Sequence, residues 1–115
     1  MRIRGNNDII NEEEVRLIAC ASDALAHPSR VEIFRFIYSE NMARRNVCNK
    51  DVVEYLGCAQ ATVSQHMRKL LISGLVEARK KETFTYYYVN IGMLGKYLNA
   101  VKKLNEPKDE EGGAE

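Results

Sequence analysis

The chain has 115 residues, 45% of them hydrophobic and 29% charged, as expected for one small globular domain. A formal net charge of +1 gives no overall signal for a polyanion partner, and three cysteines without a CxxC spacing argue against a disulfide framework. No apolar run approaches the roughly 18 residues of a membrane span, and no signal peptide is visible, so we expect a cytoplasmic protein with no membrane partner.

The first predicted helix begins at Glu12, after a polar stretch over residues 1–11 that is expected to be mobile. Asn11 and Glu14 have the three-residue spacing of a capping box, and carboxylates at this end suit the helix dipole. A narrow apolar stripe with small residues follows, formed by Val15, Ile18, Ala19, Ser22 and Leu25. Small residues permit close packing, so this helix should contact another helix of the same chain or of a partner subunit.

A second helix is predicted to begin at Pro28, which suits a first helical turn. Its side chains are apolar nearly all round, so we expect it to be the central buried helix. His27 is interpreted as a structural residue at the helix entrance rather than a metal ligand. The polar residues 39–46 predict a loop.

A pair of helices follows, joined by a short turn at residues 57–59. The first covers residues 51–57 and ends at Gly57; the second covers residues 59–74 and ends at Gly74. One face of the second helix is apolar, with Val63, Met67, Leu70 and Leu71. In a helix-turn-helix the first helix crosses the phosphate backbone and the second lies in the major groove.

The exposed face of residues 59–74 carries short and amide side chains instead of Glu/Lys pairs. Gln and Ser suit the hydrogen-bonding edges of bases in a major groove, although periodicity alone is equally compatible with a plain amphipathic helix. We expect base contacts from this face and phosphate contacts from Arg68. The expected DNA-contacting residues of the helix are Gln60, Ala61, Thr62, Ser64, Gln65 and Arg68.

Two β-prone runs at residues 75–89 surround a charged turn and predict a hairpin. A reading helix followed by a basic-tipped hairpin indicates a winged helix-turn-helix. A basic patch of Arg68, Lys69, Arg79, Lys80 and Lys81 is opposed only by Glu77 and Glu82, and we expect Arg79, Lys80 and Lys81 to contact phosphates. Aromatic residues fall on both faces of the second strand; we expect the outer aromatic face to be covered by a helix, the alternative being exposure to a ligand.

The last helix, over residues 91–105, has an apolar seam suited to a helix across a two-fold axis; closing its own domain is the alternative. The predicted dimer interface consists of Val15, Ile18, Leu94, Tyr97, Leu98 and Val101. We therefore expect residues 12–106 to form one DNA-binding and dimerisation domain. Residues 107–115 hold one lysine against four carboxylates, which leaves +4 for residues 1–106, and predict a disordered acidic tail.

Five short segments, in order from about residue 15 to residue 105, resemble the ArsR/SmtB-type winged-helix repressors. They are ALAHPSRVEIF at residues 24–34, VVEYLG at 52–57, TVSQHM at 62–67, SGLV at 73–76, and Tyr87 before Val89. The resemblance implies a mainly α fold with a β-hairpin wing, a winged helix-turn-helix that dimerises through its first and last helices. Ala59 departs from the usual capping Ser and Glu82 from the usual wing-tip Gly.

Many such repressors sense metals through a Cys-x-Cys, of which this chain keeps Cys48 but carries Lys50 at the second position. A cation there opposes a metal ion, and the last helix has no His, so we expect neither a metal nor a cofactor. The alternative is a metal- or arsenic-responsive repressor that combines Cys48 with another cysteine. No phosphate-cradling glycine loop, HExxH or nucleophile elbow is present, so no catalytic residue and no enzyme is predicted.

Lys50, Arg44 and Arg45 lie near Cys48 in the sequence and could make its thiol reactive. Cys48 is therefore the candidate sensing residue, with Cys20 as its candidate partner; a buried inert thiol is the alternative. We expect a homodimeric repressor that binds an imperfect palindromic operator in double-stranded DNA and is released by a chemical signal that the sequence does not identify. A winged-helix protein-interaction module is the alternative from another class.

Overall fold

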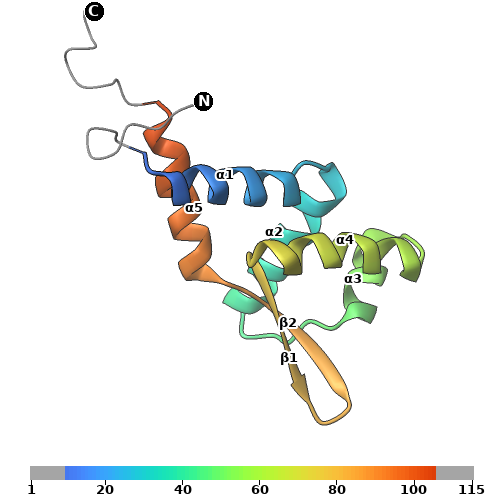
Figure 1. The fold of residues 1–115 in the computed structure, drawn as a ribbon. Helices are drawn as coiled ribbons and strands as arrows, with labels where there is room; N and C mark the ends of the chain where they lie inside the picture. Colours follow the sequence, from blue (N-terminus) through green and yellow to red (C-terminus); the bar gives the residue numbers. More distant parts are fainter. Residues whose placement is uncertain (1–9, 106–115) are drawn as a thin grey trace, which may run out of the picture.

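The computed structural model describes residues 10–105, which form five helices and one two-stranded sheet (Figure 1). The expected acidic tail at 107–115 lies outside the described residues, as does the expected mobile N-terminus except for its last two residues. The order is α1 (Glu12–Ala24), α2 (Pro28–Met42), α3 (Asn49–Leu56), α4 (Gln60–Ser73), β1 (Val76–Lys81), β2 (Phe84–Val89) and α5 (Ile91–Lys103). This is the mainly helical, winged helix-turn-helix fold that the sequence predicts.

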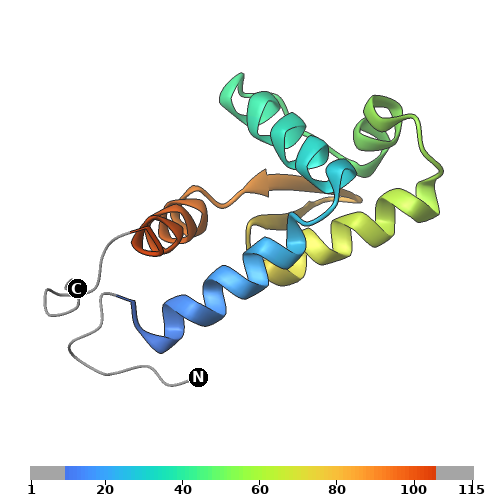
Figure 2. The same cartoon turned by 90° about the horizontal axis from the view of Figure 1, so that it is seen from above.

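The helices pack in two layers beside a projecting hairpin. Seen from above, α1 and α4 lie in the same layer with α2 behind them, and α5 stands at the end farthest from α3 (Figure 2). α5 packs against α1, while α4 contacts α1, α2, α3 and β1. None of the described helices has the length and apolar character needed to cross a membrane.

Local side-chain chemistry sets the helix ends. Asn11 Oδ1 accepts from Glu14 N–H at 2.8 Å while Glu14 Oε1 accepts from Asn11 N–H at 3.1 Å, which confirms the capping box. His27 Nδ1 accepts from the backbone N–H of Ser29 at 3.1 Å, so this histidine caps α2. Gly57 and Gly74 end α3 and α4 with φ of 71° and 83°, values that side chains with a Cβ rarely adopt.

The core lies where α2, α3, α4 and the base of the hairpin meet. Its largest fully buried side chains are Ile33, Ile37, Met67, Leu70, Leu75, Val47, Val52, Val63 and Val76. The sequence predicts that α2 is buried nearly all round, and this prediction is wrong. Val31 and Tyr38 are 38% and 37% exposed, because only one side of the helix meets α3, α4 and β2. The apolar residues on its other side face solvent.

The predicted loop at residues 39–46 is wrong in its first half, because α2 continues to Met42. The polar residues there have partners that favour a longer helix. Asn41 uses its side-chain amide at the outer edge of β2: its Oδ1 accepts from Val89 N–H at 2.9 Å and its Nδ2 donates to Tyr87 O at 3.4 Å. Val47 O accepts from Tyr87 N–H at 2.8 Å, so this edge of the hairpin is hydrogen-bonded to the body of the domain.

The outer aromatic face of the hairpin is not covered by a helix toward its tip, contrary to expectation. Phe84 remains 54% exposed and stacks on Tyr86 with ring centroids 6.0 Å apart. The guanidinium of Arg79 lies 4.5 Å from the centroid of the Tyr88 ring, so a cation covers part of this face. The helices reach only the base of the hairpin, and the tip projects beyond them (Figure 1).

Candidate nucleic-acid interface

α4 has one buried and one exposed side. Its buried residues are Val63, Met67, Leu70 and Ser73, which pack on the core or bond back to the helix. Every residue of α4 that the sequence marks for DNA contact is exposed, namely Gln60, Ala61, Thr62, Ser64, Gln65 and Arg68. The first turn has no side-chain cap, because the N-cap residue is Ala59. Its backbone N–H groups therefore remain available to a phosphate or to water.

The three basic residues of the wing are exposed but do not share one face. β1 and β2 pair antiparallel, with Arg79 opposite Tyr86, Lys80 opposite Thr85 and Lys81 opposite Phe84. Because side chains alternate along a strand, Arg79 and Lys81 lie on the aromatic face and Lys80 on the other. Arg79 Nη2 also lies 3.3 Å from Glu77 Oε1. Lys80 and Lys81 have no ion-pair partner among residues 10–105.

The wing ends in a turn that carries an acidic side chain. Glu82 has φ of 58° at the place where the resembling repressors usually carry glycine. Its carboxylate is exposed at the tip, next to Lys81. A carboxylate is repelled by phosphates, so the cations on the sides of the hairpin are better placed than its tip to approach a DNA backbone.

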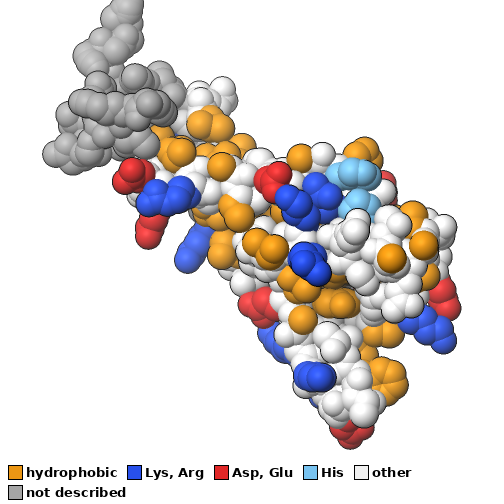
Figure 3. Space-filling model, turned by 45° about the vertical axis from the view of Figure 1, so that its right-hand side comes forward, with side chains coloured by type: hydrophobic (Ala, Val, Ile, Leu, Met, Phe, Trp, Pro, Cys, Tyr) orange, Lys and Arg blue, Asp and Glu red, His pale blue; other side chains and the backbone are white. Residues whose placement is uncertain are grey.

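A hollow of about 520 Å³ lies beside α4. Its lining residues are Cys20 and Asp23 of α1, Arg30 of α2 and Gln65, His66, Arg68, Lys69 and Ile72 of α4. Basic side chains gather next to the two histidines of the chain on this side of the molecule (Figure 3). Lys69 Nζ pairs with Asp23 Oδ2 at 3.0 Å. The sequence indicated Arg68 and Lys69 as basic residues, but nothing in it placed Arg30 and Asp23 beside them.

Arg30 ties α2 to the end of α1. Its Nε donates to Ala24 O at 2.7 Å and its Nη2 donates to Asp23 O at 3.2 Å, and the backbone N–H of Ala26 also donates to Asp23 O at 3.2 Å. Arg30 therefore pairs with carbonyl groups at the C-terminal end of α1. Its Nη1 lies 3.4 Å from His66 Nδ1, and the rings of His66 and His27 are 4.7 Å apart. Burial lowers the pKa of His66 most, and the charges of His27 and Arg30 lower it further.

The candidate sensing residue Cys48 is the N-cap of α3, and its thiol meets a carboxylate rather than the expected cations. Its backbone N–H donates to Asp51 Oδ2 at 2.9 Å and its Sγ donates to the same oxygen at 3.4 Å. Arg45 instead pairs with Glu40 at 2.8 Å, and Lys50 is exposed. The third residue of a helix reaches back to its N-cap, which explains why Asp51 and not Lys50 is the partner.

The other two cysteines lie elsewhere. Cys20 is exposed on α1, where it also lines the hollow beside α4, whereas Cys48 lies close to Tyr87 of β2. Cys58 is half-buried against the core in the turn between α3 and α4, and all three thiols are free. Among residues 10–105 no three His, Cys, Asp or Glu side chains gather in a metal-binding arrangement.

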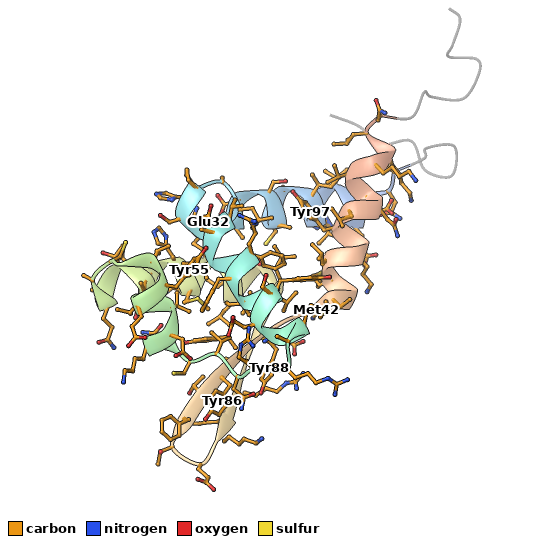
Figure 4. All side chains as sticks on the ribbon, turned by 180° about the vertical axis from the view of Figure 1, so that it is seen from behind. Glu32, Met42, Tyr55, Tyr86, Tyr88 and Tyr97 are labelled. Carbon is orange, nitrogen blue, oxygen red and sulfur yellow. The ribbon has the colours of Figure 1, made fainter. Side chains whose placement is uncertain are left out.

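The expected dimer helices lie side by side and are linked within the chain. Tyr97 of α5 points toward α1 (Figure 4), and its hydroxyl lies 2.9 Å from Ser22 Oγ. Lys103 Nζ pairs with Glu14 Oε2 at 2.7 Å. Leu98 is 55% exposed on α5, while the other residues expected at the interface are half-buried: Val15, Ile18, Leu94, Tyr97 and Val101.

Comparison with known proteins adds to this geometry. Residues 27–78 match the family model "Bacterial regulatory protein, arsR family". Over 66 residues the chain is 32% identical to an uncharacterized HTH-type transcriptional regulator of Methanocaldococcus jannaschii. The matched region covers 57% of this chain and 70% of that protein.

Two solved structures show the same fold. One is an ArsR-like transcriptional regulator from Rhodococcus sp. RHA1, with a TM-score of 0.69 and 20% identity over 80% of this chain and 82% of that one. The other is the homodimeric winged helix-turn-helix DNA-binding domain of a possible ArsR-family regulator from Mycobacterium bovis. Its TM-score is 0.62 and its identity 22%, over 86% of this chain and 89% of that one.

Proposed function

Because this chain belongs to the arsR family of winged helix-turn-helix, DNA-binding transcription regulators, we propose that it acts as a homodimeric repressor. It binds an imperfect palindrome in double-stranded DNA and leaves it when a chemical signal alters the dimer. The observation that carries the proposal is the two-sided character of α4: its apolar side is buried in the core, and its side rich in Gln, Ser and Thr is exposed. Such a helix can enter a major groove without exposing core residues.

Within this function the exposed residues divide by chemistry. Gln60, Ala61, Ser64 and Gln65 read base edges, with Thr62 beside them, because amides and hydroxyls both donate and accept hydrogen bonds. Arg68, Arg79, Lys80 and Lys81 contact phosphates, which supply most of the affinity but carry no sequence information. Arg79 contributes least, since Glu77 and Tyr88 already engage its guanidinium.

Dimerisation uses the outer sides of α1 and α5. The solved Mycobacterium bovis relative is homodimeric, and here Leu98 leaves an apolar side chain 55% exposed on α5. The interface consists of Val15, Ile18, Leu94, Tyr97, Leu98 and Val101. Burying this surface between two copies gives the two-fold arrangement that a palindrome requires.

The signal acts through a thiol. Cys48 begins α3, and α3 packs on α4, so an adduct at Cys48 displaces the Asp51 contact and shifts the helix that supports the reading helix. Cys20 is the second candidate, because it is exposed beside α4. A metal- or arsenic-responsive mechanism through Cys48 and another cysteine is the competing form of the same function.

Selection of bound duplexes from a random pool tests the DNA-binding proposal. We expect enrichment of an imperfect palindrome, and an affinity for it that falls steeply and linearly with log salt, because phosphate contacts release counterions. A winged-helix module that binds protein instead would enrich no sequence and would show a weak salt dependence.

A further inference from the structure

We propose that the hollow between α1 and α4 binds one phosphate of the DNA backbone, on the wall of the major groove opposite the wing. The inference rests on the proposed function, because it requires α4 to lie in the groove. Its ligating side chains are Lys69 and Arg68 of α4, with Arg30 of α2 supplying positive charge from the floor. α1 and α2 thereby become part of the DNA-contacting surface.

The charge balance of the hollow favours an anion. Arg30, Arg68 and Lys69 face a single carboxylate, that of Asp23, which Lys69 already contacts. The hydrogen bonds of Arg30 go to the carbonyl groups of Ala24 and Asp23 and to His66, and none of the carboxylates of residues 10–105 forms an ion pair with it. Its charge is therefore fixed in place but not neutralised, which is the condition under which an oxyanion binds most favourably.

His66 reports the same positive potential. Its ring touches His27 and Arg30, and both lower its pKa after the larger effect of burial. Asp23 and Lys69 line the same hollow and cancel each other in charge at 3.0 Å. A phosphate entering here would relieve the repulsion between neighbouring cationic groups, whereas a metal cation would increase it.

The position of the hollow matches a groove wall. An α-helix is about 10–12 Å across and a major groove about 12 Å wide, so a bound reading helix has one DNA backbone on each side. In Figure 1 the hairpin lies below α4 and α1 lies above it. Gln65 and Arg68 belong both to the hollow and to the exposed side of α4, so the hollow opens toward the groove. The wing thus serves one backbone and the hollow the other.

Charge variants of opposite sign provide the first test. Lys69→Gln should weaken binding to operator and random duplexes alike and flatten the slope of log affinity against log salt by about 0.9, the value for one lost phosphate contact. Asp23→Asn should strengthen binding to both duplexes. Lys96→Gln on the exposed side of α5 is the matched control and should leave the slope unchanged. Arg30 is not substituted, because its loss would also uncap α1.

Neutral methylphosphonate linkages, introduced one at a time into the operator, locate the contact. We expect one linkage that weakens the wild type several-fold but has no further effect on Lys69→Gln. A different linkage, on the other strand, should weaken the wild type but have no further effect on Lys81→Gln. The hollow does not bind DNA if every linkage that weakens the wild type also weakens Lys69→Gln. The proposed function still stands in that case, provided that one linkage loses its effect in Lys81→Gln. If wild-type protein binds no duplex, the proposed function itself fails.

NMR titration of the His66 ring distinguishes a DNA phosphate from a free anion. We expect operator DNA to raise the pKa of His66 and 10 mM inorganic phosphate, at matched ionic strength, to leave it unchanged. A rise with inorganic phosphate and none with DNA would assign the hollow to a small free anion and overturn the proposal. No change with either would show that the hollow takes no phosphate at all.

Discussion

Gln65 and Lys81 are both exposed, yet they differ in the kind of DNA contact that each side chain can make. A glutamine amide can pair with the edge of one base, whereas a lysine ammonium is a point charge that suits any phosphate. We therefore expect Gln65→Ala to relax the sequence preference by about 1–3 kcal/mol at one base position. Binding of single-base operator variants by fluorescence anisotropy measures this loss.

Lys81→Ala provides the complementary case. Lys81 has no ion-pair partner among residues 10–105, so its charge is free for DNA. The variant should weaken all duplexes alike and flatten the salt slope by about one unit, without changing the preferred sequence. If both variants instead lose the same affinity on operator and random DNA, the division between base-reading and phosphate-binding residues is wrong.

Individual residues also show where prediction from sequence ends. The caps at Asn11 and Gly74 can be predicted because each acts on its own helix within three residues. His27 was expected only to be structural, and its role as the cap of α2 comes from the structure. The position of Arg30 cannot be predicted from the sequence, because its role depends on the packing of α1, α2 and α4. No local pattern encodes that packing. For the same reason Lys50 is near Cys48 in the sequence but Asp51 is its partner in space.

At the scale of elements, the link between α1 and α5 depends on pH through Glu14. The hydrogen bond from Lys103 lowers the pKa of Glu14 from its ordinary value near 4.5, as does the backbone N–H of Asn11 to a smaller extent. A carboxyl whose pKa is lower in the folded state stabilises that state above its unfolded pKa and loses this contribution as pH falls through the folded pKa. Below about pH 4.5, the stability of the wild type should therefore fall partly for this reason.

Glu14→Gln removes that contribution. We expect the variant to be less stable than the wild type at pH 7, with the difference shrinking as the pH falls below about 4.5. Urea denaturation at several pH values measures the difference in free energy of unfolding between the two proteins. The protein concentration is kept constant, because dimerisation also affects apparent stability. Glu13→Gln, one residue away and without the Lys103 contact, is the control; an equal pH dependence in both variants would remove Glu14 from this role.

α3 is the element through which a thiol signal would reach α4. Glutathione disulfide reacts with a thiol to give a mixed disulfide and free glutathione, which places a bulky adduct between Cys48 and Asp51. Coupling of about 1–3 kcal/mol between this site and the DNA site would reduce operator affinity about 5–150-fold. We expect this loss in the wild type and in Cys58→Ser, and operator binding without the loss in Cys48→Ser.

Mass spectrometry decides how a negative result is interpreted. If Cys48 carries the adduct and operator affinity is unchanged, α3 does not transmit a thiol signal. A response that persists in Cys48→Ser and disappears in Cys20→Ser would move the sensing residue to α1, beside the hollow.

The extent to which each element was predictable follows from how it is stabilised. α1, α3, α4, both strands and α5 follow from periodicity and end signals, which are local. α2 was misjudged at its C-terminal end and in its burial, because Asn41 is held by β2, about 48 residues later. The uncovered face of the wing also escaped prediction, since it depends on how far the helices reach along the hairpin.

At the scale of the whole molecule, the proposed function requires two copies of the chain for DNA recognition. One reading helix contacts a single half-site, and two such helices can occupy successive major grooves on one side of a duplex only if they are about one turn apart, roughly 34 Å. A two-fold axis beside α1 and α5 would leave the N-terminal ends of the two reading helices far from the axis, because in each chain α4 begins next to α3 and α5 lies at the end farthest from α3 (Figure 2). Dimerisation and operator affinity should therefore be lost together.

Leu98→Lys separates dimerisation from folding. Leu98 is 55% exposed in the single chain, so lysine there costs the fold little, whereas in the two-fold seam it buries an unpaired charge. We expect a folded monomer by circular dichroism and analytical ultracentrifugation, with a large loss of operator affinity and retained weak binding to random DNA. Met42→Lys is the matched control, because Met42 is 56% exposed on α2, away from the seam, and its variant should remain dimeric. A Leu98→Lys protein that sediments as a dimer would require the two-fold axis to lie elsewhere.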